Sequence, residues 1–279
     1  MFDKIVVPLD GSKLAEVALP YAEELAGKTG AEIVLLSVLQ SAEQLEYENF
    51  CNYSQKLIDA TRRHAEKYKG KYRGQFINVG TATRIGSPAE GIMDYVSNGN
   101  SKLIVMATHG RSGVSRWAVG SVADKVVRTT LRQPLLLIRA RGAHPDIRAK
   151  RILKKALVPL DGSLRSEAVI SHIADMAHNL HMEITLFQAV QQNHHTREDA
   201  EAYLKGWCRQ LEEKGVSAEY EVREGSAADQ IINVADELAM DLVAMATHGQ
   251  TALSNIWPLG SVAQKVLLAG DTPLMLVRT

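Results

Sequence analysis

The stretch Met106–Val127 reads MATHGRSGVSRWAVGSVADKVV, and a near copy, Met245–Leu267, reads MATHGQTALSNIWPLGSVAQKVL. In each copy an apolar run ends in a loop, and the loop leads into a helical pattern that starts at a Gly-Ser pair. A buried strand, a loop and a helix in this order form the repeating unit of a parallel α/β sheet. The sequence therefore holds the same unit twice.

The two copies belong to two halves that match along most of their length. VPLDGS stands at Val7–Ser12 and again at Val158–Ser163. A period near 140 residues is too long for a solenoid repeat and indicates two duplicated domains instead. We predict an N-terminal domain at residues 1–141, a charged linker at 142–151 and a C-terminal domain at 152–279.

Within each half, apolar runs that are typical of buried strands alternate with amphipathic helical patterns. The first helix is predicted to begin after Ser12, which can cap it, and to continue to Gly30. Parallel strands joined by crossover helices require helices on both faces of the sheet. The expected strands of the first half are 4–9, 31–39, 75–83, 101–108 and 133–140.

Charge and composition exclude several classes of function. The 279 residues carry 32 basic and 32 acidic side chains, so the formal net charge is zero. Nucleic-acid and anionic-membrane partners favour a basic surface, so neither is expected. We see no signal peptide or membrane-spanning run, and Cys51 and Cys208 have no partner spacing. These features predict a cytoplasmic protein with two free thiols.

The ends of two expected strands suggest a ligand site. In doubly wound sheets a ligand binds at the carboxyl ends of the strands, where the strand order reverses. Asp10 follows the first strand, and Gly120 and Ser121 start a helix whose N-terminus suits phosphate. We predict a nucleotide with its base end near Asp10 and its phosphates at the Gly110 and Gly120 turns. The alternative is that Gly110 is only a turn and Ser121 only an N-cap.

The motifs VPLDGS, GSPAE, MATHGRSG, GSVADKVV and PLLLIR occur in this order over nearly the whole chain. On these motifs the chain resembles the universal stress proteins in their tandem, two-domain form. The predicted fold is therefore α/β, with two doubly wound domains, each a five-stranded parallel sheet of order 3-2-1-4-5 with helices on both faces. Members that bind ATP carry G-x2-G-x9-G-[ST], which falls here on Ala107, Gly110, Gly120 and Ser121, with Ala in place of the first Gly.

The resemblance implies three groups of contacts to ATP, with or without Mg²⁺, in the first domain. The adenine and ribose end would lie at Pro8, Asp10 and Val38, the floor at Met106, Ala107, His109 and Gly110, and the phosphates at Gly120, Ser121, Val122 and Ala123. Whether His109 and His248 contact a ligand or only shape their loops stays open. The histidines His178, His181, His194 and His195 are read as a polar helix edge, and no metal site is expected.

The second domain carries a weaker version of the site. Its loop has ten residues where the pattern has nine, Pro258 removes a backbone donor, and Arg111 and Arg116 have Gln250 and Asn255 as counterparts. ATP is therefore expected chiefly in the first domain. The corresponding residues are Pro159, Asp161, Ala189, Met245, Ala246, His248, Gly249, Gly260, Ser261, Val262 and Ala263.

The expected function is that of a stress-response regulator that acts through its nucleotide-bound state. The resemblance also implies that the fifth strands pair the two domains into an intrachain pseudo-dimer, and it allows a homodimer of chains. One alternative is a slow ATPase or a related nucleotide-transforming enzyme, although the chain lacks the S-G-G-x-D-S and H-x-G-H motifs of such enzymes. The other alternative is a scaffold that binds no nucleotide.

Overall fold

A computed structural model of the protein describes residues 2–41, 44–69, 76–97, 102–110, 119–129, 133–139, 151–190, 196–249 and 259–278. The chain divides into two compact units, Met1–Ile152 and Leu153–Thr279. The predicted contributions of Arg111, Arg116, Pro258 and the second loop's extra residue lie outside the described residues.

The first unit is a parallel sheet with the strand order β3-β2-β1-β4-β5, as predicted. Its strands are almost wholly buried at the centre, where β4 is buried along its full length. The strands are β1 (Lys4–Pro8), β2 (Glu32–Leu39), β3 (Val79–Ile85), β4 (Lys102–Ala107) and β5 (Leu135–Ile138). The helices are α1 (Lys13–Glu16), α2 (Leu19–Thr29), α3 (Gln44–Lys67), α4 (Pro88–Ser97) and α5 (Ser121–Arg128).

The second unit repeats this topology with the order β8-β7-β6-β9-β10, and its described pairings are parallel. Its strands are β6 (Lys155–Pro159), β7 (Glu183–Val190), β8 (Ala218–Glu224), β9 (Leu242–Ala246) and β10 (Leu274–Val277). Its helices are α6 (Leu164–Leu180), α7 (Arg197–Glu213), α8 (Ala227–Glu237) and α9 (Ser261–Ala269).

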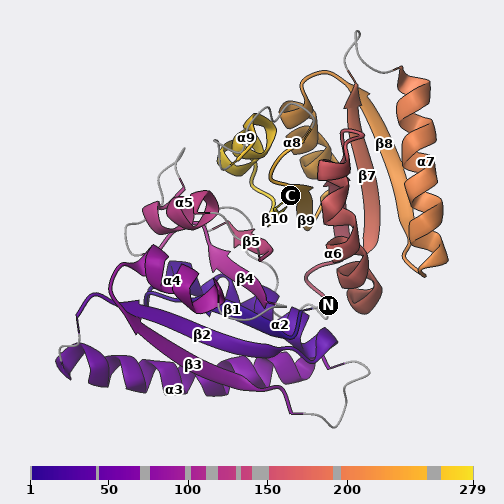
Figure 1. The fold of residues 1–279 in the computed structure, drawn as a ribbon. Helices are drawn as coiled ribbons and strands as arrows, with labels where there is room; N and C mark the ends of the chain where they lie inside the picture. The colour runs from indigo at the N-terminus through magenta and orange to yellow at the C-terminus, as the bar shows by residue number, and fades with distance from the viewer. Residues whose placement is uncertain are drawn as a thin grey trace. The chain divides into compact units, whose positions relative to one another are not determined.

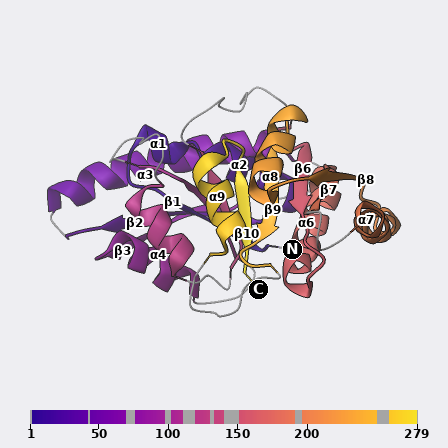
Figure 2. The same ribbon diagram turned by 90° about the horizontal axis from the view of Figure 1, so that it is seen from above.

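Helices cover both faces of each sheet. In the first unit α2 packs with α3, and α4 packs with α5 on the other face (Figure 1). In the second unit α8 packs with α9, and α7 packs along β8 (Figure 2). After β3 the chain crosses to β4 on the other side of β1, so the strand order reverses between β1 and β4. The carboxyl ends of these two strands are where a doubly wound sheet binds its ligand.

The first helix differs from the prediction because it is broken. The structure has α1 ending at Glu16 and α2 beginning at Leu19, with Pro20 in the first turn of α2. Pro20 has no N–H to donate to the carbonyl of Glu16, so a continuous helix would lose a hydrogen bond there. The second unit has Ser171 at the matching position, and α6 runs unbroken.

Candidate functional site

The turn after β1 is fixed by its own aspartate. Asp10 Oδ1 accepts hydrogen bonds from the Ser12 backbone N–H at 2.9 Å and from Ser12 Oγ at 2.6 Å. Ser12 in turn caps α1 by accepting from the Ala15 N–H at 3.2 Å, as its sequence position predicted. Gly11 allows the turn because its φ of 82° lies in the left-handed region. Asp10 therefore has a structural role before any ligand is considered.

The second unit builds the same turn from the same residue types. Asp161 Oδ1 accepts from the Ser163 N–H at 3.0 Å and from Ser163 Oγ at 2.6 Å. Ser163 caps α6 through the Ser166 N–H at 3.1 Å. The duplicated VPLDGS sequence thus produces duplicated geometry.

The Oδ2 atom of each aspartate lies against a glycine that follows the fourth strand of its unit. A Cβ built on Gly110 would collide with Asp10 Oδ2, and a Cβ built on Gly249 would collide with Asp161 Oδ2. Each carboxylate therefore occupies the volume that any larger residue would need. These contacts join the carboxyl ends of β1 and β4, and of β6 and β9, on the two sides of the point where the strand order reverses.

The start of α5 also lies close to the end of β4. The Gly120 N–H donates to the Thr108 carbonyl at 2.8 Å, and a Cβ at Gly120 would lie only 2.9 Å from that oxygen. Gly120 is the N-cap residue and Ser121 is the first helical residue, and among the described residues no side chain caps the helix. Ser121 is therefore not the N-cap residue, and phosphate binding at this helix start stays a prediction. An N-terminus without a side-chain cap leaves its first N–H groups available for an acceptor.

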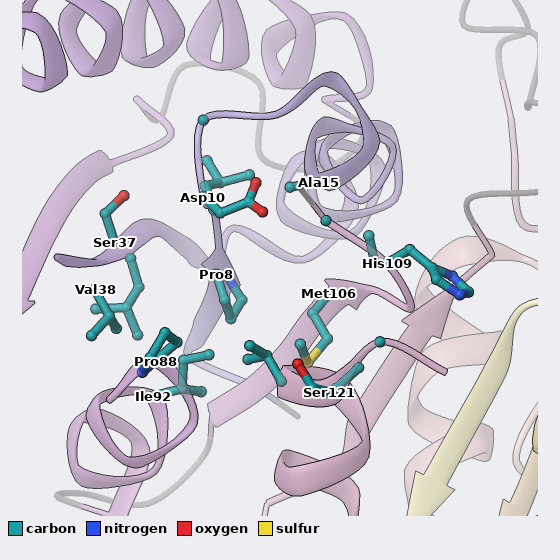
Figure 3. Close-up of a pocket in the computed structure, with 18 of the residues that line it drawn as sticks. Pro8, Asp10, Ala15, Ser37, Val38, Pro88, Ile92, Met106, His109 and Ser121 are labelled. Carbon is teal, nitrogen blue, oxygen red and sulfur yellow. The ribbon is translucent and has the colours of Figure 1, made fainter. Parts of the chain in front are cut away.

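A pocket of about 710 Å³ opens between these elements (Figure 3). All eleven residues predicted for the first site line it, and they come from β1, β2, β4, the turns that follow, and the start of α5. The pocket falls in the size range of sites for nucleotide-sized ligands. Its predicted members are Pro8, Asp10, Val38, Met106, Ala107, His109, Gly110, Gly120, Ser121, Val122 and Ala123.

The pocket has an apolar side and a polar side. Val38, Pro88 and Ile92 lie near one another on one side, whereas Asp10 and Ser121 reach it from other directions (Figure 3). Such a division suits a ligand with one flat apolar part and one charged part. The lining residues that sequence reasoning missed are Leu9, Gly11, Ala15, Leu36, Ser37, Leu39, Gln40, Tyr53, Pro88, Ile92 and Thr108.

Tyr53 reaches the pocket from α3, an element for which the sequence analysis predicted no site residue. Its hydroxyl donates to Glu16 Oε1 at 2.8 Å, and Lys13 Nζ pairs with Glu16 Oε2 at 2.7 Å. Burial raises the pKa of the Tyr53 hydroxyl, and the hydrogen bond to Glu16 raises it further. The second unit contains the matching contact, in which the Tyr203 hydroxyl donates to Glu167 Oε1 at 2.8 Å.

The two loop histidines make local contacts. His109 is buried, and its Nδ1 lies 3.0 Å from Thr108 Oγ1. Its ring points away from Val38 and Ile92 (Figure 3). His248 Nδ1 lies 3.1 Å from Thr247 Oγ1 in the same way. Both contacts join neighbours in the sequence, as expected of a residue that shapes its loop.

The predicted residues of the second site lie at the matching strand ends and helix start. The Gly260 N–H donates to the Thr247 carbonyl at 2.8 Å, as its counterpart does in the first unit. Pro159 ends β6, Ala189 lies in β7, Met245 and Ala246 end β9, and Ser261, Val262 and Ala263 form the first turn of α9.

One wall differs between the two sites. In the first unit Gly91 packs on Val38, and a Cβ at Gly91 would lie 2.8 Å from Val38 Cγ1. In the second unit Gln230 stands in place of Gly91 and Ala189 in place of Val38, so the larger residue of the pair is on the helix instead of the strand. The Gln230 amide lies over Gly225, whose N–H donates to the Val190 carbonyl at the end of β7. The second unit therefore has a polar amide beside the turn that pairs with the end of β7.

Among the residues that the structure describes there is no cluster of three or more His, Cys, Asp or Glu side chains that could hold a metal ion. Likewise, none of the described helices is both long and apolar enough to cross a membrane.

Comparison with known proteins agrees with the duplicated architecture. The model of the Universal stress protein family matches residues 1–139 and again 153–278. A universal stress protein of Methanocaldococcus jannaschii is 28% identical over 149 residues, which cover 50% of this chain and 83% of that protein. A second one from the same organism is 23% identical over 160 residues, or 51% of this chain and 98% of that protein.

A solved structure shows the same fold over the full length. The crystal structure of a universal stress protein from Archaeoglobus fulgidus aligns with a TM-score of 0.75 and 17% identity. The alignment covers 99% of this chain and 98% of that one. Two consecutive units of this fold in one chain therefore occur in that protein as well.

Proposed function

The chain belongs to the Universal stress protein family, and we propose that its first unit binds an adenine nucleotide, chiefly ATP, in the pocket described above. The observation that carries the proposal is the convergence of eleven predicted residues, from four segments of the sequence, on one pocket of about 710 Å³. That pocket lies where the strand order reverses, which is the expected ligand position in this architecture.

The chemistry of the lining residues fits the parts of ATP. Val38, Pro88 and Ile92 offer an apolar wall for the base. Asp10 offers a carboxylate acceptor for ribose hydroxyls, and its charge would repel the phosphates from that end. The uncapped N-terminus of α5 at Gly120 offers backbone donors and the positive end of a helix dipole to the phosphates.

Mg²⁺ could accompany the nucleotide, bound mainly by phosphate oxygens. Among the described residues that line the pocket, Asp10 carries the only carboxylate, and its Oδ1 already accepts two hydrogen bonds from Ser12. Mg²⁺ prefers oxygen ligands and commonly keeps several waters when it binds with a substrate phosphate. The protein would thus contribute little to the metal beyond the Ser121 hydroxyl.

We propose a regulatory role in the cytoplasm, in which the occupied pocket is the signal. The second unit would bind nucleotide more weakly, because Gln230 puts a polar amide beside the turn that pairs with the end of β7 and its loop lacks the counterparts of Arg111 and Arg116. Slow ATP hydrolysis is compatible with this role. We also propose the intrachain pairing of the two domains and a homodimer of chains, for which sedimentation analysis of the full chain is the test.

The direct test is to identify the nucleotide that the purified chain carries. The protein is denatured, and the released small molecules are separated by chromatography against ATP, ADP and AMP standards. The proposal expects an adenine nucleotide, with ATP dominant. A chain that releases no nucleotide and binds none on titration would instead be a scaffold, and rapid production of AMP and pyrophosphate would favour the enzyme alternative.

A further inference from the structure

Tyr53 gives the pocket a phenol ring in a lining that also holds aliphatic and polar side chains. Among the described residues that line the pocket, it is the only Phe, Tyr or Trp. It is also the only lining residue described on α3, whereas most of the others come from strand ends and the turns that follow them. Aromatic side chains provide large, rigid contact areas, and they stack well on other flat rings.

The Tyr53 side chain is held in place by a short chain of polar contacts. Its O–H donates to Glu16 Oε1 at 2.8 Å, and Glu16 is itself paired with Lys13. A tyrosine hydroxyl has a single hydrogen, so this bond uses the only donor that Tyr53 has. What remains for a ligand is the face or edge of the ring and a hydroxyl lone pair. The side chain is therefore suited to packing rather than to donating a hydrogen bond.

The same pair has been built twice with different spacing. Tyr53 and Glu16 are 37 residues apart, whereas Tyr203 and Glu167 are 36 apart, yet both hydrogen bonds measure 2.8 Å. In the second unit Trp207 Nε1 adds a contact to Glu167 at 3.4 Å. Both units make this contact although the number of residues between the partners differs. Equal spacing along the chain therefore does not explain the contact, which indicates that the contact itself is required.

The Tyr53 hydroxyl binds Glu16 of α1, the helix that follows the turn of Asp10 and Ser12, so the tyrosine lies on the Asp10 side of the pocket. Figure 3 shows that Ser121, at the start of the helix proposed to meet the phosphates, reaches the pocket from a different direction than Asp10. We propose that the Tyr53 ring contacts the nucleoside part of the ligand and selects for a flat ring system, with Glu16 as the residue that positions it. This inference rests on the proposed function, because it assigns a role within the same pocket.

The competing explanation is that Tyr53 only pins α3 to α1. Two variants separate these roles, Tyr53→Phe and Tyr53→Leu, both tested in the full chain. Both lose the hydrogen bond to Glu16 equally, but Phe keeps the flat ring and Leu keeps only apolar bulk. Tyr203→Leu makes the same change in the second unit and is the matched control. Circular dichroism and thermal melting verify that each variant is folded.

The probes are ATP, adenosine and inorganic triphosphate, titrated by calorimetry. We expect Tyr53→Leu to bind ATP and adenosine about tenfold more weakly than Tyr53→Phe does, by the same factor for both ligands. One stacking contact between an aromatic side chain and a base has about that effect on affinity. Triphosphate should bind equally well to both variants, and Tyr203→Leu should leave tight ATP binding unchanged.

Three results would overturn the inference while leaving the proposed function intact. The first is that the Leu and Phe variants have equal affinity for ATP. The second is that Tyr53→Leu weakens the binding of triphosphate as much as the binding of ATP. The third is that both variants lose affinity in proportion to their loss of thermal stability. If the unmodified chain binds neither ATP nor adenosine, the proposed function fails and this inference fails with it.

Discussion

Replacing Gly110 with alanine is a sharp test of the contact that joins β1 to β4. The added methyl group would occupy the position now held by Asp10 Oδ2. Because Asp10 Oδ1 is bonded to the Ser12 N–H and Oγ, the carboxylate cannot rotate away without stretching or losing those bonds. The substitution should therefore disturb the turn after β1 and the ligand acceptor at the same time.

The size of the effect follows from the bonds at risk. Hydrogen bonds to a charged group contribute about 1.5–3 kcal/mol each to stability. Losing the equivalent of one such bond should lower the free energy of unfolding of the first unit by about that amount. If Asp10 also loses one contact to the ribose worth about 1.4 kcal/mol, ATP affinity falls about tenfold.

Two glycines in the same chain provide controls. A Cβ at Gly80 on β3 meets nothing within 4 Å, so Gly80→Ala should change neither stability nor affinity appreciably. Gly249→Ala makes the matching collision with Asp161 in the second unit. It should destabilise that unit while leaving tight ATP binding intact.

The assay combines urea unfolding with titration of ATP by calorimetry. Gly110→Ala should lose stability relative to Gly80→Ala and should bind ATP at least about tenfold more weakly than Gly249→Ala. Unchanged ATP affinity in a folded Gly110→Ala protein would refute the assignment of Asp10 to the ligand. Equal loss of affinity in Gly249→Ala would refute the assignment of the tight site to the first unit.

The remaining predictions concern acidic residues. Burial raises the pKa of Glu23 to about 7 from an ordinary value of 4.5, so its stabilising contribution is complete below pH 4.5 and is lost as the pH rises through 7. At pH 8 the free energy of unfolding of Glu23→Gln should therefore exceed that of the unmodified chain by up to about 3 kcal/mol, whereas at pH 4.5 the two should be nearly equal. Urea unfolding at each pH measures this difference, and a difference that does not change with pH would contradict the prediction. Asp10→Ala should lower the affinity for ATP about tenfold or more, whereas Asp161→Ala should leave the tight ATP binding nearly unchanged. Calorimetry measures both affinities, and two sites of equal affinity would contradict the predicted difference between the units.

The resemblance to a known family implied the strand order, and local signals together with that resemblance marked half of the residues that line the pocket. Buried strands, Gly-Ser at a helix start and Asp after the first strand each occupy a few consecutive residues. Topology then brings the strand ends together. The break in the first helix also has a local signal, because Pro20 stands inside the predicted helix.

Tyr53 could not be found in this way. It lies in a long polar helix, and helical spacing alone does not say which face of α3 reaches the pocket. The contact between Asp10 and Gly110 depends on how far β1 and β4 extend beside each other, which no local pattern records. The structure repeats both features in the second unit, through Tyr203 and Gly249.

The most direct test of nucleotide binding in the first unit is an ATP titration of Gly120→Asp beside the unmodified chain. The new carboxylate would stand at the start of α5, where the phosphates are proposed to bind. A Cβ added at Gly120 would also lie only 2.9 Å from the Thr108 carbonyl oxygen. Both crowding and like charge should oppose phosphate there. We predict one tight ATP equivalent per unmodified chain and its loss in a folded Gly120→Asp protein, whereas an unchanged affinity would contradict the assignment.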